Sequence, residues 1–183
     1  NSIRDAMAIG LLKEGYSINS KNPTEINSAR DALIKQRDLT NPVYVVDEAK
    51  DNMIAGEKLI ATVWSGDAIY AMSGNPDLKY VIPKEGSNKW VDALCIPAGA
   101  KNKEAAEKFI NFLCDPQVAK QNVDYIGYST PNTAAFDLLD EETKNNPAAY
   151  PSEEELSKCT LFTDLDSETL KLYEAAFTEV LSQ

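Results

Sequence analysis

The sequence predicts an α/β fold with a largely parallel or mixed sheet flanked by helices. Short apolar stretches with strand character alternate with segments in which apolar residues recur at helical spacing. Such alternation is typical of a sheet covered by helices. Hydrophobic residues form 43% and charged residues 26% of the 183 positions, which is ordinary for a globular domain.

The first two elements are expected to be helices. Ser2 is the expected N-cap of the first, and Gly15 ends its pattern. The stretch 22–39 repeats the pattern, with Pro23 in its first turn. The apolar stripes consist of Ile3, Met7 and Leu11 in the first helix and Ile26, Ala29, Leu33 and Ile34 in the second.

Three strands are expected next, at residues 42–48, 58–66 and 78–86. The helical patterns 48–57 and 67–77 separate them. The second strand ends at Trp64. This order predicts strand–helix–strand units.

The remaining segments are mainly helical. A short apolar run, Ala93 to Pro97, is followed by amphipathic helices expected within 102–116 and 115–132. Residues 133–165 form a looser, acidic region, and 164–181 form a closing amphipathic helix.

The charge and residue types exclude several classes of function. The net charge is −11, which argues against a nucleic-acid surface and is compatible with a cationic ligand or with solubility alone. Because the chain has no His, it has no Ser-His-Asp triad and no His-ligated zinc. Cys95 and Cys114 lie on apolar faces and are expected in the core; with Cys159, they are expected to be reduced and structural.

The two Trp residues fall at predicted strand ends, where ligands bind in α/β folds. Trp64 closes one strand, and Trp90 opens another. Trp90 and Asp92 are two positions apart, so in a strand their side chains face the same way. An indole and a carboxylate together suit an ammonium group, for which the cation–π attraction is about 0.5–2 kcal/mol. Indoles also stack on sugars or fill cores, so the pattern alone leaves these readings open.

The sequence also resembles a known family. The motifs TVWSGDA, IPKEG, WVD, IGYSTPN and, near the start, SIRDAM occur in the order found in spermidine/putrescine receptors of ABC transporters. The resemblance implies a type II periplasmic-binding-protein fold with a polyamine held between two lobes. It also implies ligand contacts from Trp64, Trp90, Asp92, Asp5 and Tyr128, with no metal and no cofactor.

The resemblance further implies a domain layout and partners. This chain would be mainly the second lobe, with 1–87 as that lobe, 88–132 as a segment returning towards the first lobe and 133–183 as a closing segment. The expected partners are a polyamine and membrane permease subunits, without nucleic acid. The expected location is the periplasm or, with a lipid anchor, the extracellular face of the membrane.

Because the sequence begins within a helical pattern, we interpret it as part of a longer protein. Several alternatives remain open. A receptor of the same fold for a sugar, a metal ion or another amine is the first. An enzyme that uses Asp5, Asp67 and Asp92 as acid and base is disfavoured by the absence of His. A surface scaffold or adhesion module is the third.

Overall fold

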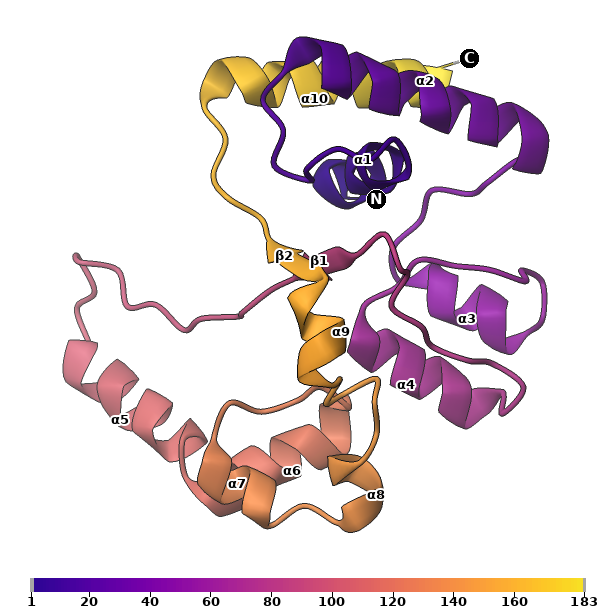
Figure 1. Ribbon diagram of the computed structural model, residues 1–183. Helices are drawn as coiled ribbons and strands as arrows, with labels where there is room; N and C mark the ends of the chain where they lie inside the picture. The colour runs from indigo at the N-terminus through magenta and orange to yellow at the C-terminus, as the bar shows by residue number, and fades with distance from the viewer. Residues whose placement is uncertain (1, 183) are drawn as a thin grey trace. The chain divides into compact units, whose positions relative to one another are not determined.

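The computed structural model describes residues 2–182, in which ten helices and two short strands are present (Figure 1). The chain divides into two compact units. Unit 1 contains the described residues up to Glu48, the segment Ile82–Trp90 and the residues from Glu153 onward; unit 2 contains Ala49–Val81 and Val91–Ser152. Each unit is described by itself.

Three helices form the core of unit 1: α1 (Ile3–Lys13), α2 (Pro23–Thr40) and α10 (Ser167–Ser182). They pack against one another, so the chain's first and last helices lie side by side (Figure 1). The Tyr173 hydroxyl is fully buried and donates a hydrogen bond of 2.8 Å to the Ser20 carbonyl oxygen. The buried core consists of Ala6, Met7, Leu11, Ile26, Ala29, Leu33, Tyr173, Ala176, Phe177 and Val180.

Local signals set the ends of these helices. The Ser2 side chain accepts from the Asp5 amide, and the Asn22 side chain accepts from the Thr24 amide, with Pro23 at the first helical position. The helix α2 ends at Asn41, which has a left-handed φ of 47°. The N-cap expected at Ser2 is therefore confirmed.

The sheet of unit 1 is parallel and has two strands. β1 (Ser87–Lys89) pairs with β2 (Cys159–Leu161), which follows the short helix α9 (Glu153–Ser157). The register places Ser87 opposite Cys159. The pairing joins a central segment of the sequence to a late one, as a parallel crossover requires.

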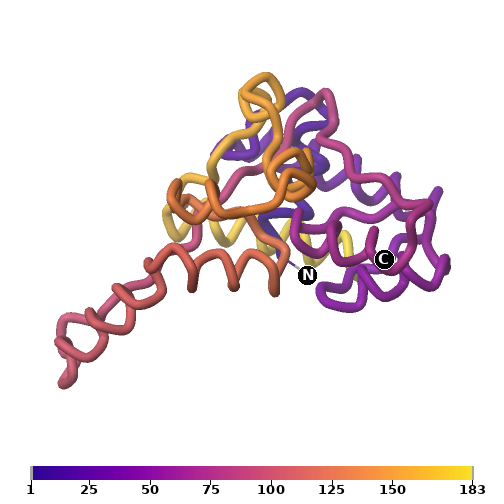
Figure 2. Tube along the Cα trace, turned by 90° about the horizontal axis from the view of Figure 1, so that it is seen from below, coloured from indigo at the N-terminus to yellow at the C-terminus, as the bar shows by residue number. Residues whose placement is uncertain are grey.

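Unit 2 is built from short helices: α3 (Glu48–Ile54), α4 (Ser65–Gly74), α5 (Lys103–Leu113), α6 (Pro116–Ile126), α7 (Thr133–Asp137) and α8 (Glu141–Lys144). Figure 2 shows α5 and α6 as consecutive helices, and α6 also packs on α7. The Asn132 amide donates to the Cys114 carbonyl oxygen over 2.8 Å, and the rings of Phe136 and Tyr150 meet edge to face at 4.9 Å. The hydrogen bond ties the loop after α6 back to the end of α5, and the ring contact ties α7 to the segment after α8.

The expected strands at 42–48, 58–66 and 78–86 have no partner strand in the described part of the chain. Most of their residues are extended without regular structure. A strand forms only when a neighbour satisfies its backbone groups, so an apolar, β-branched stretch stays irregular without one. The parallel pairing that does form is confined to β1 and β2.

The cysteine expectation is partly wrong. Cys159 is buried, but Cys95 and Cys114 are exposed, and all three are free. Cys114 ends α5, a helix without a buried residue. Apolar patterning therefore did not translate into burial in this part of unit 2. The lobe assignment of residues 1–87, 88–132 and 133–183 stays a prediction.

Candidate ligand-binding site

The first turn of α4 and the loop after α6 form the centre of a candidate site in unit 2. Gly127 ends α6 with a φ of 74°, which turns the chain and places Tyr128 next to α4. The Tyr128 ring lies directly against Gly66, where an added Cβ would overlap the ring carbons. Gly66 is therefore needed for the close approach of an aromatic ring to the backbone of α4.

Two carboxylates lie within electrostatic reach of the Tyr128 hydroxyl. Burial raises the pKa of this phenol above its usual 10.0, and the negative charges of Asp67 and Asp92 raise it further. A hydrogen bond from the Asp67 backbone amide opposes this rise, and Tyr80 adds a smaller upward effect. One half-buried phenol, two carboxylates and a second tyrosine thus lie within electrostatic reach of one another.

One cation of the chain already binds to this acidic group. The Lys50 ammonium of α3 lies 3.7 Å from the Asp67 carboxylate, and both side chains are largely shielded from solvent, with exposed fractions of 25% and 22%. Asp92 belongs to an exposed, extended segment. The site therefore has one carboxylate paired within the protein and a second that faces solvent.

Trp64 lies at the same helix end as Gly66 and Asp67. It is the N-cap residue of α4, with extended backbone angles (φ −70°, ψ 154°) and no side-chain capping bond. Its side chain is 38% exposed, so part of the indole is accessible. A Trp at a helix start where Ser, Thr, Asp or Asn is preferred is a poor cap, which fits a role outside helix stability.

Unit 1 holds the other two expected site residues. Asp5 lies in the first turn of α1 and accepts a hydrogen bond of 2.9 Å from the Asn88 side chain of β1. Trp90 follows β1 directly and is 41% exposed. The Asn88 amide thus holds the Asp5 carboxylate close to the strand that leads to Trp90.

Two groups of residues therefore emerge. Trp64, Asp92 and Tyr128 belong to unit 2, whereas Asp5 and Trp90 belong to unit 1. The boundary between the units falls between Trp90 and Val91, so the expected pair of Trp90 and Asp92 spans it. That the five side chains line one cleft stays a prediction.

Sequence reasoning did not assign Asp67, Tyr80 or Asn88 to the ligand site. Asp67 was considered only as an acid or base. Its position three residues after Trp64, at the N-terminal turn of a helix beyond a strand-like segment, is a signal that could have found it. Tyr80 and Asn88 lie in segments whose neighbours come from distant parts of the sequence, so no local pattern marks them.

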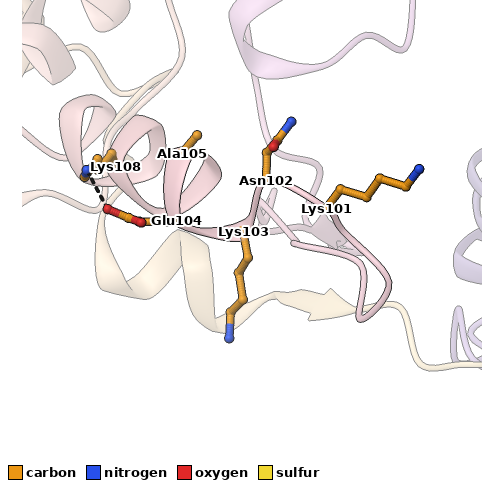
Figure 3. A pocket seen from close by; sticks show the side chains of 6 residues that line it. All are labelled: Lys101, Asn102, Lys103, Glu104, Ala105 and Lys108. Atoms are coloured by element: carbon orange, nitrogen blue, oxygen red, sulfur yellow. Dashed lines mark hydrogen bonds and ion pairs between the residues drawn. The ribbon is translucent and has the colours of Figure 1, made fainter.

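A shallow hollow of about 350 Å³ lies elsewhere, at the start of α5 (Figure 3). Three lysines line it: Lys101, Lys103 and Lys108. Lys108 pairs with Glu104 over 2.7 Å, while Lys101 and Lys103 point in different directions in Figure 3. Because its charges are mainly positive, this hollow does not suit a cation.

Within residues 2–182, no group of three or more His, Cys, Asp or Glu side chains is placed to hold a metal ion. In that same part of the chain, none of the helices has the length and apolar character needed to cross a bilayer.

The structure is similar to that of a solved solute receptor. The spermidine/putrescine ABC transporter substrate-binding protein of Streptococcus pneumoniae superposes with a TM-score of 0.84 at 38% identity, over 99% of this chain and 56% of that chain. The expected fold class, part of the type II periplasmic-binding-protein fold, is confirmed by this likeness.

Comparison of the sequence with known proteins identifies the family. The model described as bacterial extracellular solute-binding protein matches residues 1–151, and the chain belongs to this family. A spermidine/putrescine-binding periplasmic protein of Salmonella typhimurium is 41% identical over 85% of this chain and 44% of its own length. A putrescine-binding periplasmic protein of Pseudomonas aeruginosa is 32% identical over 92% of this chain and 47% of its own length. The resemblance to polyamine receptors is thereby confirmed, and the chain spans about half the length of these relatives.

Proposed function

We propose that this chain supplies part of the binding site of a polyamine receptor that serves an ABC importer. The ligand would be spermidine, putrescine or both. The observation that carries the proposal is the packing of the Tyr128 ring on Gly66 of α4, with the Asp67 and Asp92 carboxylates near enough to contribute to its raised pKa. The names of relatives from Salmonella typhimurium and Pseudomonas aeruginosa support the class of ligand.

The cluster has the chemistry that an alkyl ammonium needs. A carboxylate accepts a charge-assisted hydrogen bond from an ammonium group, and an aromatic face attracts the same cation. Asp67 already attracts an ammonium within the chain, because it forms an ion pair with Lys50 at 3.7 Å. Asp92 has the same chemistry and is exposed, so we assign to it the main contact with a ligand amine.

The aromatic residues complement this charge. A tyrosine is protonated at neutral pH, and the raised pKa of the Tyr128 phenol extends this range upward, so its ring is an uncharged surface. Trp64 presents a partly exposed indole from the same helix end. A diamine or triamine has apolar methylene groups between its charges, which such rings can cover.

Unit 1 would contribute a second set of contacts through Asp5 and Trp90. The Asn88 side chain holds the Asp5 carboxylate in place, which lowers the cost of ordering that side chain when a ligand binds. A linear polyamine carries an ammonium at each end, so two separated carboxylates match it. The joint use of the two groups is part of the proposal.

The proposed role follows from that of the relatives. They are binding proteins, so we infer that this chain binds and releases its ligand without chemical change. The expected partners are permease subunits in a membrane. The expected location is the periplasm, or the extracellular face of the membrane with a lipid anchor.

The proposal is tested by NMR titration of this chain with spermidine, putrescine and maltose. The chain has two Trp residues and therefore two indole N–H signals. The signal that disappears in Trp64→Phe belongs to Trp64, and the other belongs to Trp90. Either polyamine should shift the Trp64 indole and the amides of Gly66 and Asp67, whereas maltose should not. Because the chain spans about half the length of its relatives, we expect weak binding.

Asp92→Asn is the decisive variant because it keeps the shape and removes the charge. In a full-length receptor, where the ligand would lie between two lobes and be partly shielded from water, loss of the Asp92 carboxylate should cost about 2–5 kcal/mol, so polyamine affinity should fall roughly 30-fold or more. Trp64→Ala, which removes the ring, should cost less, about 0.5–2 kcal/mol. Asp77→Asn, an exposed carboxylate of unit 2 after α4, is the matched control and should leave the affinity unchanged. Equal affinities for Asp92→Asn and Asp77→Asn would refute the assignment of Asp92, and shifts with maltose alone would favour a sugar receptor.

A further inference from the structure

The helices α3 and α4 of unit 2 lie against each other (Figure 1). Near their C-terminal ends, a Cβ added to Gly74 would lie 3.1 Å from the Ile54 side chain. Near their N-terminal ends, the Lys50 ammonium lies 3.7 Å from the Asp67 carboxylate. These two contacts show that the helices run in the same direction, and this arrangement brings Lys50 to Asp67.

The position of Lys50 is explained by Asp67 and not by its own helix. Lys50 lies in the first turn of α3, which has no basic residue in its last turn. A cation gains nothing from the positive end of a helix dipole, whereas the Asp67 carboxylate in the first turn of α4 is favoured there. The attraction that keeps the Lys50 ammonium in place therefore comes from the neighbouring helix.

The Lys50–Asp67 pair is shielded enough for its charges to act on each other. The exposed fractions of the two side chains are 25% and 22%, whereas those of the α5 pair of Lys103 and Glu107 are 71% and 57%. Ion pairs open to water are screened and contribute little, and shielding makes the attraction stronger. Lys50 therefore compensates the charge of Asp67 from within the protein.

The ion pair lies beside the proposed ligand contacts. Asp67 and Asp92 both act on the Tyr128 phenol, and Asp92 belongs to an exposed segment. Because the fold holds Lys50 beside Asp67, its ammonium has the high effective concentration of a tethered group, on the order of millimolar or above. A ligand ammonium can use Asp67 only by displacing it, whereas Asp92 is accessible from solvent.

We propose that Lys50 is a specificity-determining residue, whose ammonium occupies Asp67 in place of a ligand cation and limits unit 2 to one ligand ammonium, at Asp92. The inference rests on the proposed function, since it concerns the charge of the polyamine that the site accepts. Putrescine carries its two ammonium groups at opposite ends, and spermidine carries a third between its ends. A second available carboxylate in unit 2 would therefore favour spermidine more than putrescine.

A double-mutant cycle on this chain tests the proposal. The parent, Lys50→Met, Asp67→Asn and the double variant are titrated with spermidine and with putrescine, and the Trp64 indole and the Gly66 amide are followed by NMR. Lys50→Met should bind spermidine about three- to tenfold more tightly, because Asp67 becomes available, and should bind putrescine with a smaller gain. Asp67→Asn should weaken binding of both by a similar factor, because it leaves the Lys50 ammonium uncompensated beside the ligand.

The double variant separates compensation from direct contact. It removes one positive and one negative charge, so its affinity for spermidine should equal that of the parent within about twofold. An affinity of the double variant far below that of the parent would overturn the proposal, because Asp67 would then contact the ligand itself. Equal gains for spermidine and putrescine in Lys50→Met would overturn the limit on ligand charge.

Lys120→Met is the matched control for net charge. Lys120 of α6 is also a partly shielded lysine of unit 2, 31% exposed and paired with Asp124, and its loss should change the affinity by less than about twofold. A gain equal to that of Lys50→Met would overturn the proposal, because net charge alone would then explain the effect. Circular dichroism checks that each variant folds, and Lys50→Gln replaces Lys50→Met if the latter does not.

The parent distinguishes failure of this inference from failure of the proposed function. Absence of polyamine shifts in the parent would refute the proposed function and this inference with it. Polyamine shifts in the parent without the expected order of the four affinities would refute the role of Lys50 alone.

Discussion

The two units contain comparable lengths of chain but bury different side chains. Unit 1 buries large ones, among them Met7, Leu11 and Tyr173, at exposed fractions near zero. Unit 2 buries mostly alanines, with Val123 and Leu139 the larger exceptions among its buried apolar residues. Its large apolar residues, such as Leu59 and Phe109, are exposed.

The difference follows from secondary structure. A helix satisfies its own backbone, so α1, α2 and α10 need only each other to close a core. A strand satisfies its backbone only through a neighbour, so the strand-like segments of unit 2 cannot close one alone. Unit 1 is therefore expected to account for most of the stability of this chain, and unit 2 for most of its accessible binding groups.

Truncating a large side chain in each unit should give the largest contrast. Leu11→Ala removes a fully buried side chain and should lower the free energy of unfolding by about 2–5 kcal/mol. Leu59→Ala, at 92% exposure, should change it by less than about 0.5 kcal/mol. Urea unfolding followed by circular dichroism measures both. If Leu11→Ala does not fold, Ile26→Val is the milder variant, with an expected loss of about 0.5–1.5 kcal/mol. Equal losses of unfolding free energy for Leu11→Ala and Leu59→Ala would mean that the two units do not differ in how much their large apolar side chains stabilise the chain.

Two glycine substitutions compare a close contact with a backbone atom and a close contact with an aromatic ring. A Cβ on Gly10 would lie 2.6 Å from the Ala29 carbonyl oxygen, so Gly10→Ala should separate α1 from α2 and cost about 1–3 kcal/mol. Gly66→Ala should cost less, because the Tyr128 ring can move away. Its clearer effect is on the Tyr128 pKa, which should fall towards its usual value once the ring becomes more exposed and moves away from Asp67.

The measurements are urea unfolding for both variants and NMR titration of labelled tyrosine for Gly66→Ala. Gly99→Ala is the control, since nothing lies within 4 Å of its added Cβ. An unchanged Tyr128 pKa in Gly66→Ala would show that the ring does not depend on this glycine.

Thiol reactivity should also separate the units. Cys95 and Cys114 are exposed in unit 2 and should react at once with a thiol reagent in the native state. Burial raises the pKa of the Cys159 thiol, which also donates to the Glu155 carbonyl oxygen over 3.5 Å. Cys159 should therefore react only after denaturation. Immediate labelling of all three would show that the β1–β2 region of unit 1 opens readily.

The smallest effect concerns two aspartates that cap helices. Asp166 accepts from the Thr169 amide at 2.8 Å and pairs with Lys21, which lowers its pKa from 3.8 to about 2. Asp140 in unit 2 accepts from the Thr143 amide, which likewise lowers its pKa. A lowered folded pKa means that each stabilises the fold above the unfolded pKa and that this contribution is lost as the pH falls through the folded one.

Asp166→Ala should therefore destabilise the chain at neutral pH, and the difference from the parent should shrink as the pH falls from 3.8 to about 2. Asp140→Ala should have less effect, because α8 is only four residues long. Urea unfolding at several pH values measures both. A difference that does not change with pH would indicate that the Asp166 carboxylate charge is not involved.

Much of the helical structure could be predicted from the sequence. The stripe of Ile3, Met7 and Leu11, the cap at Ser2 and the stop beyond α1 are local signals, and the structure has them where expected. The helix α5 was also predicted, but the exposure of its apolar face was not. Periodicity shows which face is apolar, whereas burial needs a neighbour that no local pattern names.

The candidate site was predictable in part. Trp64, Asp92 and Tyr128 were chosen from strand ends and motifs, and Tyr128 is brought next to α4 by the turn at Gly127. Tyr80 joins them through spatial proximity alone, whereas Asp67 also had a local signal, its place in the first turn of α4 after Trp64. Segments more than thirty residues apart meet there, and sequence spacing says nothing about such meetings.

By itself, then, the sequence determined the helices, their caps, the negative charge and the residue types that suit a cation, because each depends on neighbours within one or two turns of the chain. Only the tertiary structure decided which apolar faces are covered, which strands pair and which carboxylates lie within electrostatic reach of Tyr128. Those outcomes depend on contacts between distant segments, and a strand or an apolar face acquires its final state only when its partner is present.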